Sequence, residues 1–501
     1  MSTRPLRTSF VVNLLSPFAR IAIALVTIPI YIHHLGYSRY GVLTIAWILV
    51  GYFGFLDLGL SRASTNALAK LRAAPQADRA RVLLTTLILS VGFGLVGAAL
   101  LFVVGGYMFE RVLTIPADLK REVAQSFPWM VCLFPMTLVS GVASGALESR
   151  ERFLLANSLQ IFGTSLGQIA PVIMAVLVSP SLTVVIPTVA VTQATTMIIV
   201  GVCVYRLEGP FSLRAFDRAE ARTLLHYGGW VTVTAVIYPF LMAADQFLIG
   251  SLIGVAEVAH YAVPMNLILR TAAIPMALGR TFFPRLSSLP RDAAHELGRR
   301  ALEVLGYGYG AVCAPGIILA QVFFRYWIGP EFALVSAPVA QILFFGVWFT
   351  GLSFVAYTLI QSQGRPDLTG KLHFAELLPF LGVLWVLTAS FGIKGAATAW
   401  TLRCTVDAFA MFWAAGISRR DVASAIARPA ALLCGSAIAA RFVGSNLGLA
   451  IPAAVVAGLI SIGLAYAYSD DCRRILTSQL ARAWGIGGGL IRRAKQPAQT
   501  T

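Results

Sequence analysis

Long apolar runs recur along nearly the whole chain of 501 residues, separated by short polar and basic segments. A helix needs about 20 apolar residues to cross a hydrocarbon core of about 30 Å. Only helices and closed barrels satisfy their own backbone groups inside a bilayer. The runs are continuous, which excludes the alternating segments of about ten residues that are typical of a barrel. The sequence therefore predicts an all-α polytopic membrane protein.

The pattern predicts about fourteen transmembrane helices, each bounded to within a few residues. They cover residues 8–32, 40–61, 82–106, 125–147, 157–179, 184–205, 225–253, 258–283, 301–324, 337–361, 372–391, 395–416, 429–445 and 450–468. An even number of spans places both termini on the same side of the membrane.

The distribution of basic residues indicates which side that is. With both termini in the cytoplasm, 28 of the 39 Lys and Arg residues fall in inner segments and 6 in outer loops. Cytoplasmic loops of membrane proteins carry this excess. The formal charge of +17 is then explained by attraction to anionic lipids of the inner leaflet and predicts no binding to nucleic acid.

Composition agrees with a membrane protein and offers no enzyme site. Hydrophobic residues make up 57% of the chain and charged residues 12%, against about 25% charged in soluble domains. Two motifs, GFGLVG at 92–97 and GTSLG at 163–167, resemble dinucleotide and nucleophile motifs but lie inside predicted spans. Small residues there are typical of close helix packing. We predict no catalytic residue and no metal site.

Weak internal similarity indicates a duplication. LGYSRYGV at 35–42 resembles AEVAHYAV at 256–263, and GALESRERF at 145–153 resembles LIQSQGRPD at 359–367. Each pair relates a helix to the sixth helix after it, as in transporters built from parallel repeats. The predicted organisation is an N-terminal lobe (1–205), a cytoplasmic linker (206–224), a C-terminal lobe (225–416), two further helices (417–468) and a basic cytoplasmic tail (469–501).

Polar side chains form stripes on three of the spans. Along each stripe they are spaced by three, four or seven residues, so they share one helical face. The stripes are Asn13, Ser16, Arg20 and Thr27, then Tyr227, Thr234, Tyr238 and Asp245, then Asn266, Arg270 and Arg280, with Ala273 and Ala277 between the two arginines on the same face. A charge in mid-bilayer costs about 2.5–3.5 kcal/mol on insertion scales and usually faces a cavity or a partner. We expect Arg20, Arg270 and Asp245 to face water, with a structural Asp245–Arg270 bridge as the alternative.

Other charges within spans have a structural as well as a functional interpretation. Arg403 and Asp407 are four residues apart on one helix and could neutralise one another. Asp57 lies near the end of its span, and Glu376 lies about one turn into its own, where its carboxylate could reach the interface. The position of Arg441 is compatible with either interpretation.

Four diffuse stretches of the chain carry a resemblance to a known family. They are YGVLTIAWILVGYFGFLDLGLSRASTNALAK, ADQFLIGSLIGVAEVAHYAVPMNLILRTAAIPMALGRTFFPRLS, GRPDLTGKLHF and GIKGAATAWTLRCTVDAF. In these stretches the chain resembles the polysaccharide-biosynthesis flippases, the Wzx-type O-antigen and exopolysaccharide translocases of the multidrug/oligosaccharidyl-lipid/polysaccharide exporter superfamily. The resemblance covers essentially the whole chain and includes no catalytic signature.

The resemblance implies two six-helix lobes around a central cavity in the bacterial inner membrane. The cargo would be an undecaprenyl-pyrophosphate-linked oligosaccharide, and polysaccharide polymerase or export machinery would be candidate partners. We expect substrate-binding cavity residues to be Arg20, Arg270, Arg403, Arg441, Asn13, Asn266 and Tyr238. We expect ion-coupling or gating residues to be Asp245, Asp57, Asp407 and Glu376, with H⁺ or Na⁺ as the candidate coupling ion and no other cofactor.

Three alternatives remain open at this stage. A drug or cation antiporter of the same superfamily typically has twelve helices and is poorly suited to a cationic cavity. A peptidoglycan-precursor flippase has about fourteen helices and is not excluded by any motif. A glycan polymerase or ligase usually needs a large catalytic outer loop, whereas the longest outer loop predicted here, at 107–124, has about eighteen residues.

Overall fold

The structure is a computed structural model that describes residues 4–209, 216–222, 241, 243–474 and 476–477. Residues 4–20, 280, 281, 284, 291 and 366 are described by their backbone alone. This part of the chain consists of helices and connecting turns, without a strand. Eleven of its helices are long and apolar enough to cross a membrane. The predicted all-α, multi-pass fold is confirmed.

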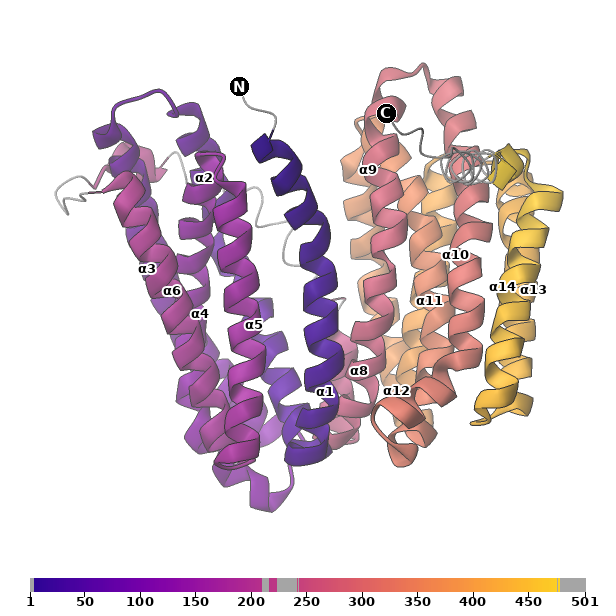
Figure 1. Cartoon of the computed structure of the whole chain (residues 1–501), viewed down its shortest axis with the longest axis horizontal. Coiled ribbons are helices and arrows are strands. Elements are labelled where there is room, and N and C mark those ends of the chain that lie inside the picture. The colour runs from indigo at the N-terminus through magenta and orange to yellow at the C-terminus, as the bar shows by residue number, and fades with distance from the viewer. Residues whose placement is uncertain (1–3, 210–215, 223–240, 242, 475, 478–501) are drawn as a thin grey trace, which may run out of the picture. The chain divides into compact units, whose positions relative to one another are not determined.

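The chain divides into two compact units (Figure 1). The first contains Met1–Ala262 with Thr388–Ile393, and the second contains Val263–Leu387 with Lys394–Thr501. The lobe boundaries expected from sequence at 206–224 and 417–468 stay predictions.

The first unit is a bundle of long helices that run beside one another (Figure 1). Its elements are α1 (Arg4–Tyr52), the 3₁₀ turn η1 (Phe53–Asp57), α2 (Leu60–Lys70), α3 (Gln76–Tyr107), the π turn η2 (Met108–Val112), α4 (Ala117–Ser149), α5 (Phe153–Leu177) and α6 (Leu182–Glu208). The helical stretches at 243–252 and 255–262, together with residues 388–393, complete it. Helix α4 packs against α2, α3 and α6, while α5 packs against α1 and α6.

Glycines allow the helices of this unit to approach closely. A Cβ atom added at Gly94 would lie 2.8 Å from Cβ of Pro135 in α4, and one at Gly97 would overlap the Phe134 ring. A Cβ added at Gly163 in α5 would lie 2.5 Å from the Thr196 methyl group in α6. The sequences GFGLVG and GTSLG therefore serve helix packing, as their placement inside spans predicted.

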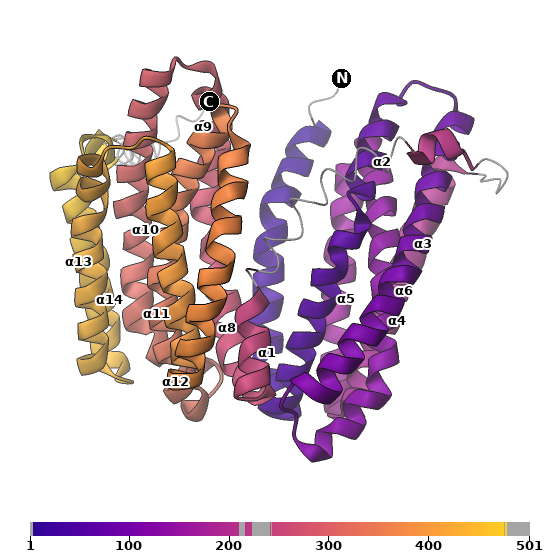
Figure 2. The same ribbon diagram turned by 180° about the vertical axis from the view of Figure 1, so that it is seen from behind.

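The second unit is built around α10 (Figure 2). Its elements are α8 (Val255–Thr271), α9 (Ala273–Ser288), α10 (Arg291–Trp327), α11 (Pro330–Ser362), α12 (Pro366–Ala414), α13 (Arg419–Val443) and α14 (Leu447–Tyr468). The unit boundary crosses α8 and α12. Helix α10 packs against α11, α13 and α14, and α9 packs against α11. Helices α13 and α14 lie side by side in both views.

Two of the helices each contain two of the expected spans. Gly36 interrupts α1 with φ 77°, between the spans expected at 8–32 and 40–61. Gly392 interrupts α12 with φ 62°, between the spans expected at 372–391 and 395–416. Glycine adopts such positive φ values without steric cost. The count of fourteen stays a prediction, because most of the span expected at 225–253 lies outside the described residues.

Two expected spans have different ends in the structure. The α-helix of the span expected at 40–61 ends at Tyr52 and continues as the 3₁₀ turn η1, and α2 starts after Leu58 and Gly59, which adopt left-handed conformations. The span expected at 258–283 is interrupted at Ala272, between α8 and α9. Pro275 lacks the N–H that would bond the carbonyl of Thr271, so the helix is broken there.

Side-chain caps start three of the helices. Ser181 accepts a hydrogen bond from Thr183 N, Ser418 accepts one from Asp421 N, and Asn446 accepts one from Gly448 N, at 3.0–3.2 Å. Each satisfies a backbone donor that has no partner within its helix. The caps fix the first residues of α6, α13 and α14.

Candidate functional site

The packing of α12 on α11 positions a cluster of polar side chains within the spans. A Cβ atom on Gly346 would overlap the Trp400 ring, so the two helices approach closely at this point. Thr401 Oγ1 donates a 3.0 Å hydrogen bond to the carbonyl of Ile342. Two turns further along, the Phe349 and Phe409 rings pack together, with their centroids 6.1 Å apart. These contacts fix the second half of α12 and place Asp407 opposite Ser353.

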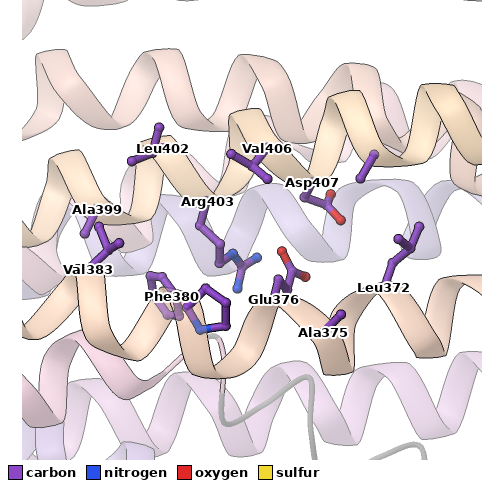
Figure 3. Close-up of a pocket in the computed structure, with 12 residues that line it drawn as sticks. Leu372, Ala375, Glu376, Phe380, Val383, Ala399, Leu402, Arg403, Val406 and Asp407 are labelled. Carbon is purple, nitrogen blue, oxygen red and sulfur yellow. The ribbon is translucent and has the colours of Figure 1, made fainter.

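The two halves of α12 run in opposite directions beside one another. The cavity between them is lined at one end by Val383 and Ala399 and at the other by Leu372 and Asp407 (Figure 3). Residues on one half therefore meet residues on the other in reverse order. This arrangement brings Glu376 of the first half close to Arg403 and Asp407 of the second.

Four ionisable side chains meet at this point, and we call His373, Glu376, Arg403 and Asp407 the α12 cluster. Ser353 Oγ donates a 2.8 Å hydrogen bond to Asp407 Oδ2. His373 Nε2 lies 3.7 Å from Asp407 Oδ1. The carboxylate of Glu376 and the guanidinium of Arg403 point toward one another (Figure 3). One ligand atom from each of His373, Glu376 and Asp407 lies within 4.8 Å of the others.

The cavity around the α12 cluster is largely apolar. Its volume is about 320 Å³. Apolar side chains form most of its wall, namely Leu372, Ala375, Pro379, Phe380, Val383, Ala399, Leu402, Val406 and Ala410. The Arg403 guanidinium lies over the Phe380 ring, 5.3 Å from its centroid. A cation above an aromatic face is attracted by the ring quadrupole.

Three carboxylate oxygens of the cluster are buried without a hydrogen-bond partner among the described residues. They are both oxygens of Glu376 and Oδ1 of Asp407. Buried polar atoms are usually hydrogen-bonded, and a buried charge needs a compensating partner. With a neutral imidazole, two carboxylates and one guanidinium give the cluster a formal charge of −1. The cluster is therefore suited to accept a proton or a small cation.

The two acidic residues of the first unit that were expected to serve ion coupling, Asp57 and Asp245, are hydrogen-bonded by neighbouring residues. Asp57 accepts hydrogen bonds from Ser61 N at 3.2 Å and Ser61 Oγ at 2.9 Å, and so supports the first turn of α2. Asp245 is fully buried, and its Oδ2 accepts a 2.6 Å hydrogen bond from the Tyr261 hydroxyl. The expectation that Asp245 faces water is thus not met, because a protein hydroxyl and Gln246 N hold its carboxylate.

Three of the remaining predicted residues lie on α8 and α13. Arg270 is half-buried near the end of α8, Asn266 is exposed on the same helix, and Arg441 is exposed in the last turn of α13. A cation in the last turn of a helix is favoured by the helix dipole. The side chains of Arg20, Asn13, Arg280 and Tyr238 lie outside the described residues. Of the predicted site residues, the structure brings together Glu376, Arg403 and Asp407.

A family model provides the decisive comparison. The model described as "Polysaccharide biosynthesis protein" matches residues 35–323, which is more than half of the chain. The chain belongs to this polysaccharide biosynthesis family.

Curated relatives of this family member include two membrane proteins. The chain is 28% identical over 385 residues to a Shigella flexneri protein named "Putative O-antigen transporter", covering 76% of this chain and 90% of that one. It is 26% identical over 187 residues to an uncharacterized membrane protein of Methanocaldococcus jannaschii, covering 36% of this chain and 37% of that one.

Solved structures with the same fold are transporters. The lipid II flippase MurJ in an inward closed conformation has a TM-score of 0.71 at 11% identity, covering 91% of this chain and 99% of that one. An inward-facing multidrug resistance transporter of the MATE family of the MOP superfamily has a TM-score of 0.62 at 15% identity. The match covers 81% of this chain and 98% of that one. The family member is therefore a multi-pass membrane protein with the fold that these transporters share.

Sequence reasoning on this polysaccharide-biosynthesis protein missed two members of the site. His373 was passed over, although it lies three residues before Glu376 and so shares its helical face. Ser353 carried no signal, because serine is common in membrane helices and its partner Asp407 is 54 residues away in sequence.

Proposed function

We propose that the protein is a flippase for undecaprenyl-pyrophosphate-linked oligosaccharide repeat units. It would move them from the cytoplasmic to the periplasmic leaflet of the bacterial inner membrane by alternating access, with both termini in the cytoplasm. The observation that carries this proposal is the similarity to the Shigella flexneri protein, which extends over 90% of that protein. The excess of basic residues in the predicted inner segments supports the orientation.

The cargo explains why charges are retained in apolar helices. A pyrophosphate and a hydrated glycan cannot enter hydrocarbon without a large desolvation cost, whereas the polyprenyl tail can stay in lipid. Arg20 and Arg270, with Arg403 and Arg441 as weaker candidates, would bind the pyrophosphate through charge-assisted hydrogen bonds. The affinity of these arginines for the pyrophosphate must differ between the inward-open and outward-open states, since a ligand with equal affinity for both does not shift the equilibrium between them.

Coupling to an ion gradient is the role we propose for the buried carboxylates. The α12 cluster has a net formal charge of −1 and three carboxylate oxygens without a hydrogen-bond partner among the described residues. A proton or Na⁺ bound there would neutralise the cluster. Asp245 is a second candidate, since its carboxylate is fully buried in the first unit. Polysaccharide polymerase or export proteins would receive the translocated oligosaccharide repeat unit.

Accumulation of the cargo tests the proposal. Deletion of the gene should leave lipid-linked repeat units on the cytoplasmic face, and the cloned gene should restore their transfer. If the accumulating lipid instead carries the peptidoglycan precursor, the protein belongs with flippases of the MurJ type, whose fold it shares. Normal glycan export in the deletion strain, together with resistance changes to organic cations, would favour an antiporter.

A further inference from the structure

The α12 cluster contains a donor set that its electrostatic role does not require. It combines one imidazole nitrogen, from His373, with carboxylate oxygens from Glu376 and Asp407, all within 4.8 Å of one another. A proton or Na⁺ needs only the oxygens. We propose that His373, Glu376 and Asp407 form a binding site for a divalent transition-metal ion, with Zn²⁺ as the best-fitting member of that class.

The donor types decide the class of ion. Imidazole nitrogen is a ligand of Zn²⁺ and its first-row neighbours, whereas Mg²⁺ and Ca²⁺ prefer oxygen donors alone. Three protein ligands with an open fourth position are a common arrangement for Zn²⁺. Among first-row divalent ions, Zn²⁺ and Cu²⁺ bind a given site of this kind more tightly than Mn²⁺ or Fe²⁺.

The distances are compatible with ligation after small side-chain movements. Zn–N and Zn–O bonds of about 2.0–2.2 Å place tetrahedral ligands about 3.4 Å apart. The nitrogen of His373 and Oδ1 of Asp407 are already 3.7 Å apart. All three ligand atoms lie within 4.8 Å of one another, so each separation has to shrink by at most about 1.4 Å, which a rotation of the long Glu376 side chain can supply.

Hydrogen bonding leaves the required carboxylate oxygens available. Asp407 Oδ2 accepts from Ser353, which orients the carboxylate as outer-shell partners orient metal ligands. Its Oδ1, the atom on the side of His373, has no hydrogen-bond partner among the described residues. Both carboxylate oxygens of Glu376 also lack a hydrogen-bond partner among the described residues. A metal ion would satisfy Asp407 Oδ1 and one carboxylate oxygen of Glu376.

Arg403 sets the expected strength of the site. Its guanidinium points toward Glu376 and carries no lone pair that could bind a metal. With a divalent ion bound, the cluster changes from a formal charge of −1 to +1, so the arginine opposes binding. We therefore expect moderate affinity, and an increase in affinity when Arg403 is replaced by Met.

A bound ion would join the two halves of α12. His373 and Glu376 lie before the Gly392 turn and Asp407 lies after it. Because the ion would occupy the carboxylates proposed above to take the coupling proton or Na⁺, Zn²⁺ should compete with that ion and slow translocation. This last step rests on the proposed function, whereas metal binding itself does not.

Calorimetric titration of the purified full-length protein with Zn²⁺ alone tests the site. We expect one ion per chain, and a Co²⁺ titration should give the visible absorption of a site with nitrogen and oxygen donors. His373→Gln, Glu376→Gln and Asp407→Asn should each weaken Zn²⁺ binding at least about tenfold. Zn²⁺ should also raise the thermal midpoint of the wild-type protein and not that of the three variants.

The matched control replaces the adjacent exposed histidines His33 and His34 by Gln. This variant should bind Zn²⁺ as the wild type does. Loss of binding in the control, with binding retained in the α12 variants, would assign the metal to the surface and overturn the inference. Absence of any stoichiometric binding would also overturn it, while leaving the flippase proposal intact. Zn²⁺ binding without cargo accumulation in a deletion strain would instead remove the flippase proposal alone.

Discussion

Arg79 of α3 and Glu208 of α6 form an ion pair at 2.6 Å in which both side chains are fully buried. The guanidinium also donates to Ser149 Oγ at the end of α4 and to the carbonyl of Leu68 in α2. Arg150 donates to the same carboxylate at 2.7 Å, which raises the pKa of Arg150. Glu208 thus compensates two arginines, and the ends of four helices in the first unit meet at this network.

Loss of the Glu208 charge should be costly. Glu208→Gln leaves the Arg79 guanidinium buried without its counter-ion, for which we expect a loss of about 3–5 kcal/mol of stability. Arg79→Met should cost less, because Glu208 keeps Arg150 as a partner. Thermal unfolding of the purified variants measures both. The control is Glu151→Gln, which removes an exposed pair with Arg72 and should cost under about 1 kcal/mol. Equal effects of Glu208→Gln and Glu151→Gln would contradict this prediction.

The Tyr261 hydroxyl should matter to both stability and transport. Tyr261→Phe removes the 2.6 Å donor to Asp245 and leaves a buried carboxylate oxygen short of a partner, at a cost of about 1–3 kcal/mol. If Asp245 serves coupling, translocation should fall further than the stability loss explains. Thermal unfolding and a lipid-linked glycan transfer assay measure the two effects. Tyr107→Phe, at an exposed position, should change neither.

The close approach of α11 and α12 should not tolerate a side chain at Gly346. Gly346→Ala places a methyl group against the Trp400 ring and Thr401, and such overpacking typically costs about 1–3 kcal/mol. Gly382→Ala, where a Cβ would meet nothing within 4 Å, should be neutral or slightly stabilising because alanine favours helix. The thermal unfolding midpoints of the two purified variants measure this difference in stability. A Gly346→Ala protein as stable as Gly382→Ala would show that the two helices can separate freely.

Removal of the proposed pyrophosphate ligands should abolish transport without loss of the protein. Arg20→Ala and Arg270→Ala should each reduce translocation at least about tenfold, the loss expected when a charge-assisted hydrogen bond of about 1.5–3 kcal/mol is removed. Lys394→Ala, at an exposed position, is the control and should keep wild-type transport. Export of the glycan, normalised to membrane-inserted protein, provides the measurement. Full activity in both arginine variants would remove them from the substrate site.

Much of the fold could be predicted from hydropathy, because a span is a local property of about 20 residues. The segments expected at 82–106, 157–179 and 450–468 lie within or close to α3, α5 and α14. Helix ends that depend on single backbone conformations were not predictable in this way. The left-handed pair Leu58–Gly59 and the break before Pro275 changed two spans that hydropathy treated as continuous.

The site was less accessible to sequence reasoning, because it depends on pairing between distant segments. Arg79 was counted as a loop residue outside its span, whereas α3 begins at Gln76 and buries it against Glu208, 129 residues away. Glu376 and Asp407 were selected because charges are rare in apolar helices. Ser353 could be recognised only after α12 had been placed on α11, whereas the contact of His373 with Asp407 depends on the pairing of the antiparallel halves of α12.

The turn at Gly392, between the two halves of α12, has no loop residues into which a segment could be inserted. One residue with φ 62° reverses the direction, and helix continues on both sides of it. An epitope or reporter fused there would have to unwind the helices or push them apart. The turns at Gly364 and Gly416, both with positive φ and both between helices, are where membrane topology can be mapped by tagging without disturbing the metal ligands.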